Sequence, residues 1–311
     1  MADTQDLATP SADASSAAKT PAPDALVDAL YRPMRTAQVI DRIEQELSSA
    51  GEAFFQICGS GHEAAAAVNL FLNQDDWLHP HYRSKALMVA RGIGPKAWFD
   101  SSLTNADNYS AGRQMCSFMA SRELNLPSTV IPVGNNAMQA VGIAMQIKDD
   151  PGKPIVLCGL GDGTTQQGEV MEAMAEAARS NLPVLFWIED NGYAISTPTN
   201  GQTFYNFPPS KDHPFFGLAI NHFDGRHILP ELDRIGALVD EVRQSRGPRI
   251  GVMRVDRLCN HSNADDQRIY RDADTLVTLN EKSNAVVNLR KALIEAGVDE
   301  VKLDEADAAI E

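Results

Sequence analysis

The sequence has few cysteines, and none of them are closely paired. Its 311 residues include Cys58, Cys116, Cys158 and Cys259, and no two of these form a C-x-x-C motif. Two disulfides are possible by count, but scattered, partly strand-borne thiols are more typical of buried, reduced cysteines in a cytosolic protein. We therefore expect free thiols and a cytoplasmic protein.

Positive charge and long apolar runs are also scarce. Lysine and arginine number 27 against 42 aspartates and glutamates, which gives a net charge of −15. Counterion release, which drives proteins onto duplex DNA, would not favour binding by such an acidic chain. No apolar run approaches the roughly 20 residues that a membrane helix needs. The sequence therefore argues against a nucleic-acid partner and against a membrane protein.

The first 23 residues differ in composition from the rest of the chain. They are rich in Ala, Ser, Thr, Asp and Pro and lack the apolar segment of a signal peptide, so residues 1–23 are predicted to be a disordered tail. Helical spacing of apolar residues predicts helices over 24–51, in 62–72, twice within 85–103, and near 135–148. With no internal repeat or linker, residues 24–311 are predicted to form one α/β domain.

A strand, a helix and a second strand follow one another in the middle of the chain. Residues 155–160 and 183–189 are continuous apolar runs, as expected for parallel strands covered on both faces, and 169–180 reads as the crossover helix between them. A further helix over 231–245 and a strand over 248–256 repeat the pattern. We predict a doubly wound, mostly parallel sheet with helices on both faces.

Polar residues follow both strands of this unit. Gly161, Asp162 and Gly163 end the first strand, and Asn191 follows the second, 191 − 162 = 29 positions later. Ligands of open α/β sheets bind just outside the carboxyl ends of the strands, where these residues converge. A carboxylate and an amide oxygen beside an anion-binding turn suit Mg²⁺ bridging a phosphate. A nicotinamide site would need G-x-G-x-x-G, and position 164 is Thr; an ordinary glycine-rich turn is the other alternative.

The GDG sequence, followed by an asparagine about 30 residues later, resembles the thiamine diphosphate motif. Five further segments agree in order: "GSGHEA" (family G-x-E-A), "HYR", "GRQM", "QAVGIA" and "HSNADDQRIYR". Over residues 30–271 the chain is similar to the alpha subunit of the decarboxylating component of 2-oxo acid dehydrogenase complexes, nearest to the branched-chain type. The resemblance implies a thiamine diphosphate-binding fold with thiamine diphosphate and Mg²⁺ as cofactors.

The resemblance also implies roles for individual residues. Asp162 and Asn191 would bind Mg²⁺ through their side chains and Tyr193 through its backbone carbonyl. The remaining cofactor contacts would come from Gly161, Gly163 and Thr164 beside the diphosphate, Tyr82 and Arg83 facing it, and Ile131 and Val133 near the rings. His261 would be catalytic, lining the site and assisting acyl transfer to lipoyl groups, and Phe55 and His81 would lie near the substrate. The alternatives are a surface arginine at 83, core residues at 131 and 133, and a solvated histidine at 261.

The family's mechanism further needs a glutamate on the pyrimidine side of the cofactor, which we do not find in this chain. The resemblance therefore implies a beta-type subunit that carries it, usually in an α₂β₂ assembly, and a lipoyl acyltransferase core. The substrate would be a small 2-oxo acid, either branched-chain or pyruvate. An acetoin dehydrogenase alpha subunit and a non-catalytic paralogue acting as an interaction subunit are the alternatives.

The chain departs from the branched-chain pattern in three places. Glu189 stands where branched-chain relatives carry arginine, and Asn135-Asn136 replaces the Thr-Gln of their potassium site, so we do not predict that ion. The chain also ends earlier than typical alpha subunits, as a truncated chain or half of an alpha–beta fusion would.

Overall fold

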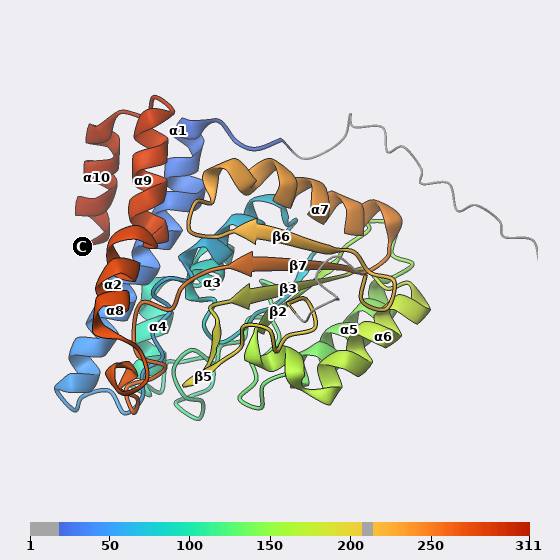
Figure 1. Ribbon diagram of the computed structural model, residues 1–311, viewed down its shortest axis with the longest axis horizontal. Coiled ribbons are helices and arrows are strands. Elements are labelled where there is room, and N and C mark those ends of the chain that lie inside the picture. Colours follow the sequence, from blue (N-terminus) through green and yellow to red (C-terminus); the bar gives the residue numbers. More distant parts are fainter. Residues whose placement is uncertain (1–18, 207–213) are drawn as a thin grey trace, which may run out of the picture.

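A five-stranded parallel sheet forms the centre of the computed structural model, which describes residues 19–206 and 214–311. In spatial order its strands are β1 (Trp77–His79), β2 (Val156–Gly161), β3 (Val184–Asp190), β7 (Arg249–Arg254) and β6 (Ile220–Asp224), and all neighbours are parallel. Figure 1 shows the arrows of β3, β7 and β6 pointing the same way. The predicted βαβ unit is confirmed, while the edge strands β1 and β6 were not predicted.

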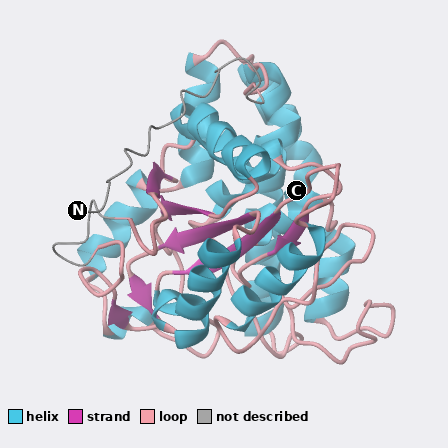
Figure 2. Ribbon diagram, turned by 90° about the vertical axis from the view of Figure 1, so that its right-hand side faces the viewer, coloured by secondary structure: helices cyan, strands magenta, loops and turns pink. Residues whose placement is uncertain are grey.

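Helices occupy most of the remaining described chain (Figure 2). None of the described helices is long and apolar enough to cross a membrane. The main ones are α1 (Pro23–Leu26), α2 (Arg32–Ser49), α3 (Lys85–Arg91), α4 (Pro95–Ser102), α5 (Asn135–Ile147), α6 (Gly168–Ser180), α7 (Leu232–Ser245), α8 (Ala273–Lys282), α9 (Ala285–Glu295) and α10 (Glu300–Ile310).

The two faces of the sheet are covered by different helices. Because side chains alternate along a strand, Leu185 and Trp187 of β3 join a core cluster with α2, α7 and α9, whereas Phe186 and Ile188 join a second cluster with α5 and α6. Figure 1 shows α5 and α6 together, apart from α7. The doubly wound architecture predicted from the sequence is therefore confirmed.

Two predicted helices have a different local geometry from that expected. The helix predicted over 24–51 contains a π-helical turn over Val27–Tyr31, just before Pro33, which has no N–H to donate to the preceding turn. The alanine-rich segment is a 3₁₀ helix, η2 (Glu63–Phe71), in which Ala64 to Ala67 are fully buried. Small side chains let this segment pack closely against its neighbours.

Residues 1–18 of the predicted tail lie outside the described residues. Residues 19–22 form no helix or strand, and the Thr20 hydroxyl donates to Asp233 of α7. Helix α1 begins at Pro23, one residue before the predicted start of the domain. The first described segment of the chain therefore contacts the rest of the protein.

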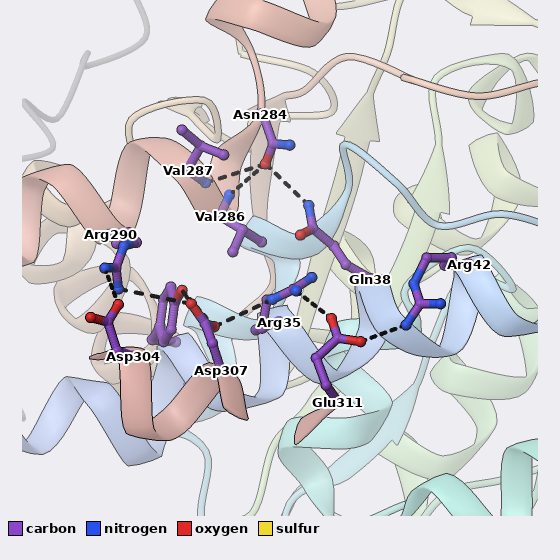
Figure 3. Close-up of polar contacts among 11 residues, drawn as sticks. Arg35, Gln38, Arg42, Asn284, Val286, Val287, Arg290, Asp304, Asp307 and Glu311 are labelled. Carbon is purple, nitrogen blue, oxygen red and sulfur yellow. Dashed lines mark hydrogen bonds and ion pairs between the residues drawn. The ribbon is translucent and has the colours of Figure 1, made fainter. Parts of the chain in front are cut away.

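The C-terminal helices are joined to α2 by polar contacts (Figure 3). Glu311 pairs with Arg35 and Arg42, each at 2.6 Å, and the Gln38 amide donates to Asn284, the N-cap of α9, at 3.1 Å. Such partly exposed ion pairs add at most about 1 kcal/mol each. The larger contribution comes from burial of Leu289, Leu293 and Leu303 in the core beneath them.

The expectation that the cysteines are free thiols was wrong for one pair. Cys58 and Cys259, which are 201 positions apart in sequence, are joined by a disulfide with Cα atoms 6.4 Å apart. The fold brings these distant segments together within the range that a disulfide spans, which spacing in the sequence could not indicate. Cys116 and Cys158 are free and buried, as expected.

Gly251 on β7 offers a test of how tightly the sheet packs. A Cβ at this position would lie 2.7 Å from the buried Trp187 ring and 3.3 Å from Leu238. We expect Gly251→Ala to lower the free energy of unfolding by roughly 1–3 kcal/mol, because an overpacked core must shift. Urea denaturation of the purified chain measures this. Gly142→Ala on α5 is the matched control, because its Cβ would meet nothing within 4 Å; a Gly251→Ala variant as stable as this control would contradict the packing argument.

Candidate active site

The carboxyl ends of β2 and β3 lie side by side and present polar residues at one edge of the sheet. The register pairs Gly161 with Glu189, so Asp162 and Asn191 leave adjacent strands at the same edge. Both side chains are buried, with Asp162 2% and Asn191 8% exposed. The structure therefore brings together the two residues that the sequence singled out.

A cavity of about 260 Å³ opens at this edge. Val133 and the hairpin of β4 (Tyr193–Ala194) and β5 (Thr197–Pro198) form part of its wall. Two residues proposed from the sequence do not line it: Phe55 lines a separate cavity with Met115 and Cys116, and Ile131 is 61% exposed. The lining residues are His81, Tyr82, Arg83, Val133, Gly161, Asp162, Gly163, Thr164, Gln167, Asn191, Tyr193, Ala194, Ile195 and His261.

Two glycines bring the walls of this cavity together. A Cβ on Gly159 would lie 2.5 Å from the backbone nitrogen of His81, and one on Gly163 would lie 2.6 Å from Ala194 Cβ. Gly159 therefore lets the "HYR" segment lie against β2, and Gly163 lets the hairpin with Tyr193 lie over the turn. Gly163, which the resemblance places beside the diphosphate, also lines the cavity.

Asp162 has few groups that compensate its charge. The Thr199 hydroxyl donates to its carboxylate. Burial nevertheless raises the pKa of Asp162 to about 6, and the nearby Asp190 carboxylate adds to the rise. No group of three or more His, Cys, Asp or Glu side chains able to hold a metal exists among the described residues. A metal at this edge would therefore need amide, carbonyl or ligand oxygens besides carboxylates.

The side chain of Asn191 is held on both sides. Its Oδ1 accepts from the Tyr193 backbone N–H at 3.0 Å, and its Nδ2 lies 3.0 Å from His62 Nε2. The other ring nitrogen of His62 lies 2.7 Å from Glu189. Burial lowers the pKa of His62 well below its usual value, so the ring is neutral. No role was predicted from the sequence for His62 or Glu189. His62 lies in the G-x-E-A motif, and Glu189 is a carboxylate in an apolar strand, so both carried a signal.

Arg83 is buried and faces His261. It is 2% exposed, donates to the Cys58 carbonyl at 2.5 Å, and places Nη2 3.0 Å from His261 Nδ1 and 3.1 Å from the His261 carbonyl. The alternative that Arg83 is a surface residue is therefore wrong. Burial, with Arg83 and Arg257 beside the ring, lowers the pKa of His261 to about 4, so His261 is neutral at physiological pH.

The loop that carries His261 is held by other residues of its own motif. Asp265 accepts from the His261 backbone N–H at 2.8 Å and from the Tyr270 hydroxyl at 2.6 Å. Arg257, which is fully buried, donates to the Tyr270 oxygen at 2.6 Å and to the Ile195 carbonyl at 2.9 Å. These contacts join the His261 loop to Ile195, in the turn between β4 and β5 that lines the same cavity.

The sequence also matches a known protein family. Residues 31–310 match the family described as "Dehydrogenase E1 component", so the chain belongs to that family. It is 28% identical over 273 residues to the mitochondrial 2-oxoisovalerate dehydrogenase subunit alpha of Caenorhabditis elegans, covering 86% of this chain and 62% of the relative. It is also 28% identical over 272 residues to the mitochondrial 2-oxoisovalerate dehydrogenase subunit alpha 1 of Arabidopsis thaliana, and the match covers 87% of this chain and 57% of the relative.

A bacterial relative is matched over more of its length. The 2-oxoisovalerate dehydrogenase subunit alpha of Bacillus subtilis is 28% identical over 291 residues, covering 90% of this chain and 87% of the relative. By contrast, the chain spans less than two thirds of the length of the Caenorhabditis and Arabidopsis relatives.

The contact between Arg83 and His261 predicts a measurable titration. Removing the guanidinium in Arg83→Gln should raise the pKa of His261 from about 4, because a cation beside the ring disfavours its protonation. The pKa should remain below the usual value of about 6.5, because burial is the larger cause. NMR titration of histidine-labelled protein measures the shift. Arg254→Gln is the control, since Arg254 pairs with Asp190 instead; an unchanged His261 pKa in Arg83→Gln would contradict the contact.

Proposed function

We propose that this chain is the alpha subunit of a 2-oxo acid dehydrogenase that binds the Mg²⁺-diphosphate end of thiamine diphosphate. Its reaction would be the oxidative decarboxylation of a 2-oxo acid with acyl transfer to lipoyl groups. The observation that carries the proposal is the cavity at the carboxyl ends of β2 and β3, where Asp162, Asn191 and Arg83 converge. Membership of the dehydrogenase E1 family supports the same reading.

The residues present fit a magnesium diphosphate group. Asp162 offers a carboxylate oxygen, Asn191 an amide oxygen and Tyr193 a backbone carbonyl, and Mg²⁺ prefers such a small set of oxygens completed by phosphate and water. The raised pKa of Asp162 shows that its charge is poorly compensated in the protein alone. A bound cation would compensate this charge. Arg83 and Thr164 line the same cavity and would face the phosphate oxygens.

Thiamine diphosphate, when bound, supplies the electron sink for loss of carbon dioxide from a 2-oxo acid. The chain's own residues hold and orient the reactants. Arg83 can only donate, so the His261 nitrogen that faces it, Nδ1, is an acceptor and the ring proton lies on Nε2. His261 Nε2–H would then donate to an acyl oxygen during transfer to a lipoyl group. Val133 and Ile195, which line the cavity, would help to exclude water from it.

Features of the cavity support a second subunit. Its volume of about 260 Å³ falls below the roughly 300–1,000 Å³ of pockets that enclose a whole ligand. Among the described lining residues, Asp162 carries the only carboxylate, so a glutamate for the pyrimidine must come from elsewhere. Two apolar side chains that line the cavity are also exposed: Val133 is 37% and Ile195 55% exposed. A beta-type subunit in an α₂β₂ assembly would cover them, and a lipoyl acyltransferase core would accept the acyl group.

The names of the relatives, 2-oxoisovalerate dehydrogenase subunit alpha, favour a branched-chain 2-oxo acid as substrate. Decarboxylation by the purified complex across branched-chain 2-oxo acids, pyruvate and acetoin tests this choice. Turnover of acetoin alone would support the acetoin dehydrogenase alternative. No turnover with any compound, despite assembly with a beta-type subunit, would support the non-catalytic paralogue.

Asp162→Asn should separate cofactor binding from folding. The variant keeps the shape of the side chain but removes its charge, so affinity for thiamine diphosphate should fall by at least about tenfold and lose most of its dependence on Mg²⁺. Calorimetric titration of the assembled protein with and without Mg²⁺ measures both. Asp76→Asn is the control, because Asp76 is a buried carboxylate paired with Arg243 rather than part of this site. Equal, Mg²⁺-independent affinity in wild type and Asp162→Asn would refute the metal bridge.

If the site is shared with a second subunit, turnover must depend on that subunit. The purified chain alone should show negligible turnover, since the pyrimidine half of the site is missing, and activity should appear when a beta-type subunit is added. A steady-state assay against increasing beta subunit, with the alpha chain held constant, should reach a plateau at equal amounts. Full turnover by a monomer of this chain would contradict the shared site.

A further inference from the structure

Behind the proposed metal site lies a buried row of polar side chains that the proposed function does not use. Ser84, just before α3, donates to Glu189 on β3, and the other oxygen of Glu189 lies 2.7 Å from His62 Nδ1. His62 Nε2 lies 3.0 Å from the side-chain nitrogen of Asn191. Ser84, Glu189 and His62 are each 1% exposed or less. The row therefore ends on a proposed metal ligand, out of contact with solvent.

The direction of these hydrogen bonds follows from which groups can donate. The Tyr193 backbone N–H can only donate, so the Asn191 atom that it contacts is Oδ1, which keeps a second lone pair free. The Asn191 NH₂ group therefore faces His62 Nε2, which must accept. The ring proton of His62 then lies on Nδ1, where it donates to Glu189, and Ser84 donates to the other Glu189 oxygen.

An asparagine amide can rotate by half a turn with little change of shape, but only one orientation serves a cation. With its oxygen outward the group can bind Mg²⁺, and with its NH₂ outward it repels the ion. We infer that Glu189 and His62 are positioning residues that fix the side-chain amide of Asn191 with its oxygen toward the metal. The inference rests on the proposed function, because the metal is the one proposed there.

Two substitutions of Glu189 separate this role from a merely structural one. Glu189→Met is close in size but cannot accept, so His62 would lose the partner that holds its proton on Nδ1. With the proton on Nε2, the ring would oppose the Asn191 NH₂, and only the Tyr193 N–H would still favour the oxygen-outward orientation. Glu189→Gln can still accept from His62 through its amide oxygen while its NH₂ faces Ser84. We expect Mn²⁺ affinity in the presence of thiamine diphosphate to fall roughly 10–100-fold in Glu189→Met. In Glu189→Gln the Mn²⁺ affinity should stay within about threefold of wild type, because the Gln amide oxygen still accepts from His62.

The measurement is electron paramagnetic resonance titration of Mn²⁺ with the full chain assembled with a beta-type subunit. Glu44→Met is the matched control, because Glu44 is equally buried and hydrogen-bonded to Lys85 and Ser102 instead. It should lower thermal stability and leave Mn²⁺ affinity unchanged. Equal Mn²⁺ affinity in wild type and Glu189→Met would overturn the positioning role alone, whereas wild type without thiamine-dependent Mn²⁺ binding would overturn the proposed function.

A second measurement needs no variant and covers the case in which Glu189→Met fails to fold. Long-range ¹H–¹⁵N correlation spectra of the full chain distinguish the two neutral forms of a histidine ring. We expect His62 to carry its proton on Nδ1 in the wild type. A His62 ring protonated on Nε2 would place the Asn191 oxygen against it and overturn the inference.

Discussion

The register between β2 and β3 is the constraint on which the rest of the site depends. Pairing Gly161 with Glu189 makes both strands end together, so Asp162 and Asn191 enter one small space from adjacent strands. A slip of one residue would turn the alternating side chains of a strand to the opposite faces of the sheet. The packing of Trp187 on one face and Phe186 on the other therefore fixes the site as well as the core.

Around this edge the chain assembles groups of opposite charge, although the whole molecule is acidic. Arg83 and Arg257 are almost fully buried, and both lower the pKa of His261. Asp162 lies in the same cavity with a raised pKa. Such a site is electrostatically incomplete on its own. A cation beside Asp162 and an anion beside the arginines would compensate both, as a magnesium diphosphate does.

The centre of this arrangement was predictable from sequence because the signals there are local. Continuous apolar runs ending in GDG and in Asp-Asn-Gly define two parallel strands and their common edge. The edge strands were missed for physical reasons: β1 has only three residues, and β6 is a polar edge strand with one buried side chain. The disulfide and the His62–Glu189 contact depend on tertiary proximity that no spacing reveals. Helices α8, α9 and α10 were not predicted, although each begins after a residue that favours a helix N-cap. These N-cap residues are Asp272, Asn284 and Asp299.

We propose that Asp162, Asn191 and the hairpin at Tyr193 hold a metal ion that bridges a diphosphate. Anomalous diffraction from crystals of the alpha–beta complex grown with Mn²⁺ and thiamine diphosphate tests it most directly. We expect one strong anomalous peak at about 2.0–2.2 Å from a carboxylate oxygen of Asp162, Oδ1 of Asn191 and the Tyr193 carbonyl. A diphosphate bound with the anomalous peak elsewhere, or with the Asn191 amide turned away from the peak, would show that these residues do not hold the metal.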